Sequence, residues 1–162
     1  MKFYGRYDTI PLENDSNTYV YQQDFAFLRS DGLMIISPEG TTTDGASCPR
    51  FLWSLIGSPL SGSNKEWSSP HDSAYRKAAV IINTLHPDAI DPLMMFVRWR
   101  TISSKFFVHQ TCKNKKFADD TLLEAMKTCG EPWFKQMLVY RAVRLFGVGW
   151  WGEATLGTPD AS

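Results

Sequence analysis

The sequence has few cysteines, and their spacing is typical of neither a disulfide framework nor a zinc site. Only Cys48, Cys112 and Cys129 occur, an odd number without a Cys-x-x-Cys pair. Small secreted domains depend on paired cysteines, and structural zinc sites depend on closely spaced ones. We therefore expect free thiols and synthesis in a reducing cytosol.

The chain also lacks an excess of charge of either sign and any long hydrophobic run. Its 17 Lys and Arg residues balance its 17 Asp and Glu residues, which argues against general nucleic-acid binding because that binding depends on surplus positive charge. The basic run at 113–116 is interpreted as a solvated loop. The longest apolar runs, 78–82 and 94–97, are too short to cross a bilayer, and no signal-peptide segment follows Met1. We expect a soluble protein, or part of a soluble assembly, with no signal peptide and no transmembrane helix.

The length, composition and residue pattern predict a single α+β domain over residues 1–162. The length and the 43% hydrophobic content are sufficient for a core. No internal repeat, GxGxxG motif or P-loop occurs. The pattern predicts a small N-terminal antiparallel sheet in the β-rich residues 1–45, a mainly helical body at 46–147 and a tail at 148–162.

Strand and helix signals divide these regions further. Ser30-Asp31-Gly32 is a turn signal between two apolar strands, and one of these strands is expected to be fully buried. The predicted strands are 19–21, 25–28 and 33–36. Helical periodicity and breaking residues define the helices. The predicted helices are a short one capped by Ser47 and running through Ile56, 69 to about 85, a stretch starting at 91–92 with apolar positions to Ile102, 117–128 and 133–146.

One segment of eight residues combines an imidazole, a carboxylate and a phenol: Ser69-Pro70-His71-Asp72-Ser73-Ala74-Tyr75-Arg76. Ser69 is a good N-cap and Pro70 suits the first helical position, which predicts that a helix begins here. His71 and Tyr75 then share one face. A histidine in the first turn is kept neutral by the helix dipole, as a general base requires. The alternative is an ordinary helix start, in which Asp72 closes a capping box and pairs with the arginine four residues later.

The helix at 117–128 supplies a partner for this histidine. Its apolar positions place one carboxylate of Asp119 and Asp120 inward, and the face shared with Ala118 and Leu122 favours Asp119. A buried carboxylate needs a partner, and an inward Asp that faces His71 would hold the imidazole in one tautomer. The alternative is that both Asp residues only stabilise a helix start.

Further polar residues are candidates for the same site. Asp44 and Ser47 lie in a polar turn, where the alternative roles are an Asx-turn and a helix cap. Arg144 lies on one side of the strongly amphipathic last helix. It either neutralises a core carboxylate, binds phosphate or forms an ordinary ion pair.

Four segments together resemble a domain-of-unknown-function family that is found mostly in tailed bacteriophages and prophages. They are Thr43-Asp44-Gly45-Ala46-Ser47-Cys48-Pro49-Arg50-Phe51-Leu52-Trp53, His71-Asp72-Ser73-Ala74-Tyr75-Arg76, Ala118-Asp119 and Val143-Arg144-Leu145-Phe146-Gly147. The resemblance covers about residues 20 to 150 and adds Arg50 to the candidates. It implies a phage protein that is made in the host cytoplasm, is packaged in the virion or its tail, and has other phage structural proteins as partners.

A second, local resemblance concerns chemistry. His71-Asp72-x-x-Tyr75, followed by Ala118-Asp119, is similar to the active site of phospholipase A2, especially of the short viral-capsid kind. It implies that His71 is the base that activates water, that Asp72 binds calcium, and that Tyr75 and Asp119 support them. The glycine-rich calcium loop of that family is represented only by Gly57-Ser58-Pro59 and Gly62.

The expected function is hydrolysis of an ester or amide of the host envelope, with lipid as the first substrate, peptidoglycan as the second and calcium as the cofactor. The alternative is a non-enzymatic structural or accessory tail protein. In that case His71, Asp72, Tyr75 and Asp119 form a buried polar network that fixes two helices. Exposure separates the two hypotheses, because a catalytic His71 lines an open cleft and a structural one is covered.

Overall fold

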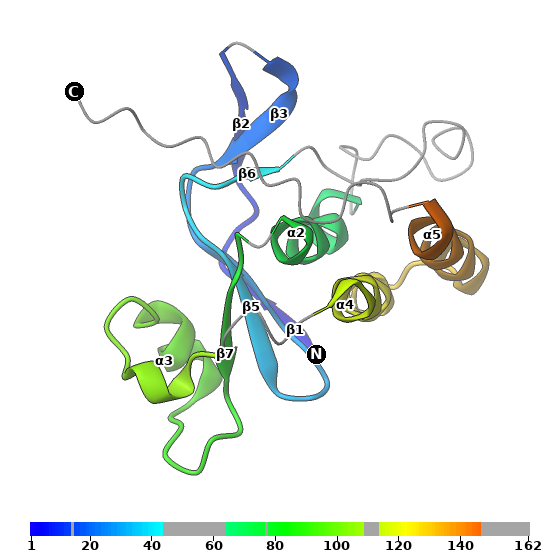
Figure 1. Ribbon diagram of the computed structural model, residues 1–162. Coiled ribbons are helices and arrows are strands. Elements are labelled where there is room, and N and C mark those ends of the chain that lie inside the picture. Colours follow the sequence, from blue (N-terminus) through cyan, green and yellow to red (C-terminus); the bar gives the residue numbers. More distant parts are fainter. Residues whose placement is uncertain (14, 44–63, 77, 109–113, 147–162) are drawn as a thin grey trace.

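The computed structural model describes residues 1–13, 15–43, 64–76, 78–108 and 114–146 (Figure 1). These residues have the predicted α+β fold, in which antiparallel strands precede most of the helices. The strands are β1 Lys2–Tyr4, β2 Thr9–Leu12, β3 Asp15–Tyr21, β4 Phe25–Leu28, β5 Leu33–Ser37, β6 Thr42–Thr43 and β7 Val80–Asn83. The helices are α2 Asn64–Tyr75, α3 Pro92–Val97, α4 Lys115–Thr128 and α5 Trp133–Phe146, with a short 3-10 turn η2 at Ser104–Phe106.

The larger sheet has the order β1-β4-β5-β7, and every neighbouring pair is antiparallel. The predicted turn at 30–32 joins β4 to β5, and both strands are almost completely buried. Successive residues of a strand point to opposite faces of the sheet. The continuous apolar run of β5 therefore means that both faces of this sheet are covered, as expected for a fully buried strand.

Helices cover the two faces of the larger sheet from opposite sides (Figure 1). Phe27, Ile35 and Ile81 are cross-strand neighbours that face α2 and α4, and α5 packs on α4 beyond them. Met34 and Ile82 face the opposite side, toward α3 and the segment that follows it. Burial of each such side chain contributes roughly 1.5–3 kcal/mol to the free energy of unfolding.

The smaller sheet has the order β2-β3-β6 and contacts α2 through β6. Thr43 ends β6, pairs with Tyr19 of β3 and is completely buried. Tyr21 ends β3, is also completely buried, and donates a hydrogen bond from its hydroxyl to Ser69 Oγ of α2 at 2.6 Å. This hydrogen bond, together with one from the Thr43 hydroxyl to Asp72 Oδ2, fixes the face of α2 that carries its polar residues.

The predicted start and end of the His71 helix are wrong. α2 already runs from Asn64 and ends at Tyr75, so Ser69 and Pro70 lie inside the helix. Buried packing outweighs the local preference of Ser-Pro for a helix start, since Trp67 is completely buried one turn earlier. Val80, which was predicted to continue this helix, begins strand β7, because a run of β-branched residues pairs better with β5.

The other helix predictions have different outcomes: the short helix after Ser47 lies outside the described residues, the helix at 91–92 exists but ends at Val97, and the last two agree with the structure. α3 starts after Asp91, whose carboxylate accepts hydrogen bonds from the backbone N–H groups of Leu93 and Met94. α4 and α5 occupy the segments predicted as 117–128 and 133–146, with α4 starting two residues earlier. None of the helices in the described ranges has the length and apolarity that a bilayer span requires.

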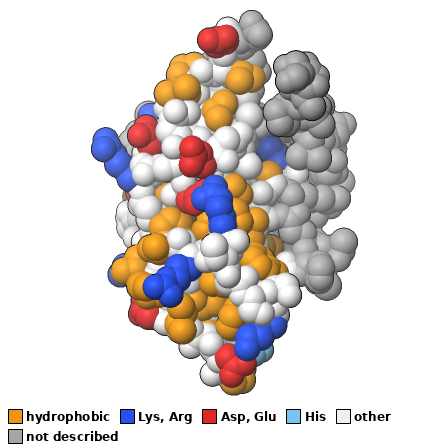
Figure 2. All heavy atoms as spheres, turned by 90° about the vertical axis from the view of Figure 1, so that its left-hand side faces the viewer, with side chains coloured by type: hydrophobic (Ala, Val, Ile, Leu, Met, Phe, Trp, Pro, Cys, Tyr) orange, Lys and Arg blue, Asp and Glu red, His pale blue; other side chains and the backbone are white. Residues whose placement is uncertain are grey.

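The face of the molecule on the α3 side mixes apolar and charged side chains (Figure 2). Leu93, Met94 and Val97 of α3 are exposed, at 50%, 37% and 66%. Ion pairs lie close by, such as Arg100 with Asp24 and Lys105 with Asp88. This face lies on the opposite side of the larger sheet from α2 and α4.

Candidate functional site

Three helices bring the predicted site residues together. α2 supplies His71, Asp72 and Tyr75, α4 supplies Asp119, and α5 supplies Arg144. Lys115, in the first turn of α4, joins them. We call His71, Asp72, Lys115, Asp119 and Arg144 the His71 cluster.

His71 lies between two carboxylates. Its Nε2 is 3.4 Å from Oδ1 of Asp119, and its Nδ1 is 3.6 Å from Oδ1 of Asp72. The first contact is a long hydrogen bond and the second is an ion-pair contact. Asp119 is thus the nearer carboxylate, and its predicted role in orienting the ring stays a prediction.

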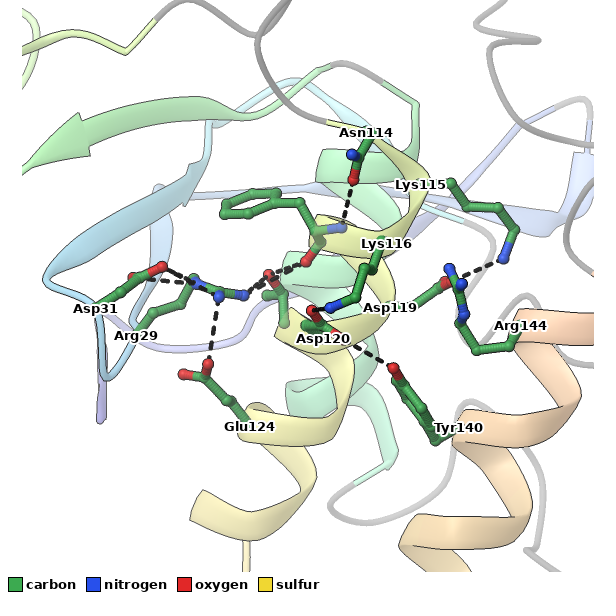
Figure 3. Close-up of polar contacts among 12 residues, drawn as sticks. Arg29, Asp31, Asn114, Lys115, Lys116, Asp119, Asp120, Glu124, Tyr140 and Arg144 are labelled. Carbon is green, nitrogen blue, oxygen red and sulfur yellow. Dashed lines mark hydrogen bonds and ion pairs between the residues drawn. The ribbon is translucent and has the colours of Figure 1, made fainter.

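Two cations hold the other oxygen of Asp119. Lys115 Nζ donates to Oδ2 at 2.7 Å, and Arg144 Nη1 donates to the same oxygen at 3.1 Å (Figure 3). Asp119 is completely buried, so these partners offset the cost of removing a carboxylate from water. Among the alternatives for Arg144, neutralisation of a core carboxylate is the one that this geometry supports.

Asp120 points away from the cluster, toward Lys116 and Tyr140 (Figure 3). Its side chain is 30% exposed, while that of Asp119 is at 0%. The prediction that Asp119 is the inward residue of the pair is confirmed.

Tyr75 packs its ring against His71, with ring centroids 4.9 Å apart, one helical turn away on the predicted face. Burial and the negative charge of Asp119 raise the pKa of Tyr75 to about 12, so the phenol stays protonated at neutral pH. Lys115 Nζ lies 5.8 Å from the centroid of the same ring. The Tyr75 ring thus packs along one side of the His71 cluster.

The pKa of His71 is raised, which corrects the prediction of a ring kept neutral by a helix N-terminus. Burial opposes the charged ring and lowers this pKa, but the hydrogen bond to Asp119 and the charges of both carboxylates outweigh burial. The ring lies in the interior of α2, so the dipole of the first turn does not act on it. Burial raises the pKa of Asp119, but His71, Lys115 and Arg144 together hold it below its ordinary value.

These opposite shifts predict how the stability of the cluster depends on pH. A raised folded-state pKa means that His71 stabilises the fold fully below its ordinary value of 6.5 and stops doing so as the pH rises through the raised value. Asp119 stabilises the fold above its ordinary value of 3.8 and loses this effect as the pH falls through the lowered value. The His71 cluster therefore stabilises the fold most between pH 3.8 and pH 6.5.

Urea unfolding of the wild type and of His71→Asn, from pH 3.8 to alkaline pH, measures how the contribution of His71 to stability changes. We expect the largest difference in the free energy of unfolding near pH 5 to 6, in roughly the middle of the most stabilising range, and a smaller difference toward alkaline pH. His86→Asn is the control, because His86 lies outside the cluster with a half-buried ring. A difference that grows steadily toward alkaline pH would contradict the assigned charge of His71.

The cluster is covered by the surrounding protein. His71 is only 1% exposed, and Asp72 and Asp119 are at 0%. In this conformation the imidazole does not line an open surface. By the exposure criterion stated above, this observation favours the polar-network alternative.

Asp72 contacts β6 as well as His71. Its Oδ2 accepts a hydrogen bond from the Thr43 hydroxyl at 2.6 Å. Calcium requires six to eight oxygen ligands, and the part of the chain that the structure describes holds no group of three His, Cys, Asp or Glu side chains arranged to bind a metal ion. The role of Asp72 as a calcium ligand stays a prediction.

Three candidates, Asp44, Ser47 and Arg50, lie outside the described residues, in the segment directly after Thr43. Sequence reasoning missed Lys115, because the basic run around it was interpreted as a solvated loop. Its spacing of four residues from Asp119 on one helix was the available signal. Arg76, the predicted ion-pair partner of Asp72, is half-buried directly after α2, and its pairing with Asp72 stays a prediction.

Comparison with known proteins identifies the family. Residues 19–143 match the family described as "Protein of unknown function (DUF1353)". The chain is also 27% identical over 154 residues to an uncharacterized protein, y4jT, of Sinorhizobium fredii (strain NBRC 101917 / NGR234). That similarity covers 92% of this chain but 36% of y4jT, so the chain spans about a third of the length of this relative. No solved structure matches the chain.

The family match includes His71, Asp72, Lys115 and Asp119 and ends at Val143, one residue before Arg144. The predicted membership of a family of unknown function is confirmed, while the phage context stays a prediction. The chain belongs to the DUF1353 family.

Proposed function

We propose that the chain is a hydrolase in which His71 acts as general base on a water molecule. The single observation that carries this proposal is the oriented His71–Asp119 pair, in which one ring nitrogen faces a buried carboxylate that is itself held by two cations. Such a pair fixes the tautomer of an imidazole and stabilises the imidazolium that forms when it takes a proton. The resemblance to the phospholipase A2 motif supports the same assignment.

The proposed reaction follows from the two ring nitrogens. Nε2 carries the proton that faces Asp119, which leaves the lone pair on Nδ1. Nδ1 removes a proton from water, the resulting hydroxide forms a bond with the carbonyl carbon of an ester, and the C–O bond to the leaving group then breaks. The imidazolium returns its proton to the leaving alcohol, so acid and alcohol are the products.

We infer a phage protein as the context and a component of the host envelope as the substrate, with a phospholipid ester first and peptidoglycan second. The resemblance to phage and prophage proteins supports this inference. In a virion or its tail, such an activity would open a passage for the genome. Because His71 is 1% exposed, the reaction requires a conformation in which Nδ1 is accessible to water and substrate.

An assay of the purified chain tests the proposal. The substrates are phospholipid vesicles, a soluble short-chain ester and purified peptidoglycan, each with added calcium and with a chelator. Product release that depends on the His71 imidazole supports the hydrolase. Release in calcium alone would assign the metal-dependent form, and no release from any substrate would reject the hydrolase.

A second function is favoured by a specific observation, the burial of His71 at 1% exposure. We infer as the alternative a structural or accessory protein of the phage tail, whose His71 cluster holds α2, α4 and α5 together. Trp150 and Trp151 are candidate docking residues for this role and lie outside the described residues. Under this alternative the cluster affects stability and assembly and has no activity to lose.

A further inference from the structure

Lys115 contacts all three helices of the His71 cluster. Its Nζ donates to Asp119 Oδ2 on α4 and to the backbone carbonyl of Val143 on α5, each at 2.7 Å. Its ammonium group also lies over the Tyr75 ring of α2. The side chain is only 16% exposed, unlike that of its neighbour Lys116 at 63%.

The carbonyl that Lys115 contacts belongs to the C-terminal end of a helix. α5 ends at Phe146, so the Val143 carbonyl lies in the last turn of the helix. A positive charge at this end of a helix is favourable. Arg144, from the same turn, extends back to Asp119. Two charged contacts thus join α4 and α5 next to the Asp119 carboxylate. Lys115 of α4 binds the Val143 carbonyl, and Arg144 of α5 binds Asp119.

We propose that Lys115 is a positioning residue, which fixes the Asp119 carboxylate so that its Oδ1 faces Nε2 of His71. This inference rests on the proposed hydrolytic function. A carboxylate rotates about one bond, so holding one of its oxygens sets the direction of the other. With Oδ2 held by Lys115, Oδ1 is directed at the ring, the proton stays on Nε2, and Nδ1 keeps its lone pair.

Lys115 is better placed for this role than Arg144. It makes the shorter contact with Oδ2 and is itself anchored by the Val143 carbonyl, so its position does not depend on Asp119 alone. The Arg144 side chain is 39% exposed, and water competes for its donor groups. Removal of Lys115 is therefore expected to disturb the carboxylate more than removal of Arg144.

Steady-state kinetics on the ester that the wild type hydrolyses is the first measurement. Lys115→Met removes the charge and keeps the length of the apolar stem. We expect kcat to fall roughly 10- to 100-fold with KM changed less than about twofold, because the orientation of the base is lost and substrate binding is not. Lys115→Arg, which keeps a donor and a charge, is expected to recover most of kcat.

Lys116→Met is the matched control. Lys116 is the next residue on α4 and also pairs with an Asp four residues later, but on the exposed side of the helix. Its replacement should leave kcat and KM unchanged. An equal fall in kcat for Lys116→Met, or an unchanged kcat for Lys115→Met, would overturn the proposal.

The 15N shifts of the His71 ring give a second measurement that needs no activity. At the alkaline end of the titration, a fixed tautomer gives well-separated shifts for Nδ1 and Nε2, and we expect Lys115→Met to bring them closer together. Unchanged shifts would overturn the role of Lys115, even if the wild type hydrolyses nothing. An inactive wild type whose ring shifts respond to Lys115→Met would reject only the hydrolase. If circular dichroism shows that Lys115→Met is unfolded, Lys115→Gln takes its place in both measurements.

Discussion

His71→Asn is expected to abolish ester hydrolysis while the chain remains folded. Asparagine keeps a polar group near the position of Nδ1 but has no nitrogen that accepts a proton near neutral pH. General-base catalysis contributes roughly 10²- to 10⁴-fold to a rate, so the variant should lose at least about 100-fold in kcat. The measurement is product release under saturating substrate, together with circular dichroism of both proteins.

His86→Asn is the matched control for this experiment. His86 lies beside Asp88 and packs on Phe106, on the far side of the sheet from the cluster. The same substitution there should leave the rate within about twofold of the wild type, since no reacting group is touched. Activity retained by His71→Asn would exclude His71 as the base. A wild type without activity, combined with a destabilised His71→Asn, would favour the structural alternative.

Asp119→Ala is expected to cause the largest loss of stability of any single substitution in the cluster. It removes the carboxylate that faces His71, Lys115 and Arg144 at once, and leaves buried positive charge without its counter-ion. Breaking a buried ion pair by removing one partner costs about 3–5 kcal/mol. Urea unfolding monitored by tryptophan fluorescence measures this as a lower midpoint with an unchanged slope.

Asp120→Ala separates this effect from a general change in α4. Asp120 is the next residue, pairs with Lys116 and Tyr140, and is 30% exposed. An exposed pair of this kind contributes about 0–1 kcal/mol. Equal losses for the two alanine variants would mean that the helix, and not the His71 cluster, is what the substitutions perturb.

Periodicity predicted those parts of the fold whose local pattern and packing agree. The strands around the turn at 30–32, the helix starting after Asp91 and the helix at 133–146 are of this kind. The inward direction of Asp119 followed from the same reasoning, since the apolar neighbours of a helical residue define its face. The meeting of Asp119 with His71 was proposed from chemistry, and the geometry agrees with it.

The predictions failed for the start of the His71 helix, for the Val80 segment and for Lys115, where tertiary contacts outweigh local signals. Ser69 has a strong preference for a helix start, yet its hydroxyl accepts a hydrogen bond from Tyr21, 48 residues away in the sequence. Val80 and its neighbours fit an amphipathic helix as well as a strand, and only pairing with β5 decides between them. The contact of Lys115 with the Val143 carbonyl spans 28 residues, and no local pattern encodes it.

The larger sheet takes its last strand from residues 80–83, after α2, although its other three strands lie within the first 37 residues. This order has a consequence for synthesis on the ribosome. The early strands carry apolar side chains on both faces, and the helices that cover them come from later parts of the chain. The nascent N-terminal half therefore cannot bury its own hydrophobic surface until α3 and α4 have emerged. During that interval it presents the exposed strand edges and apolar faces that chaperones bind.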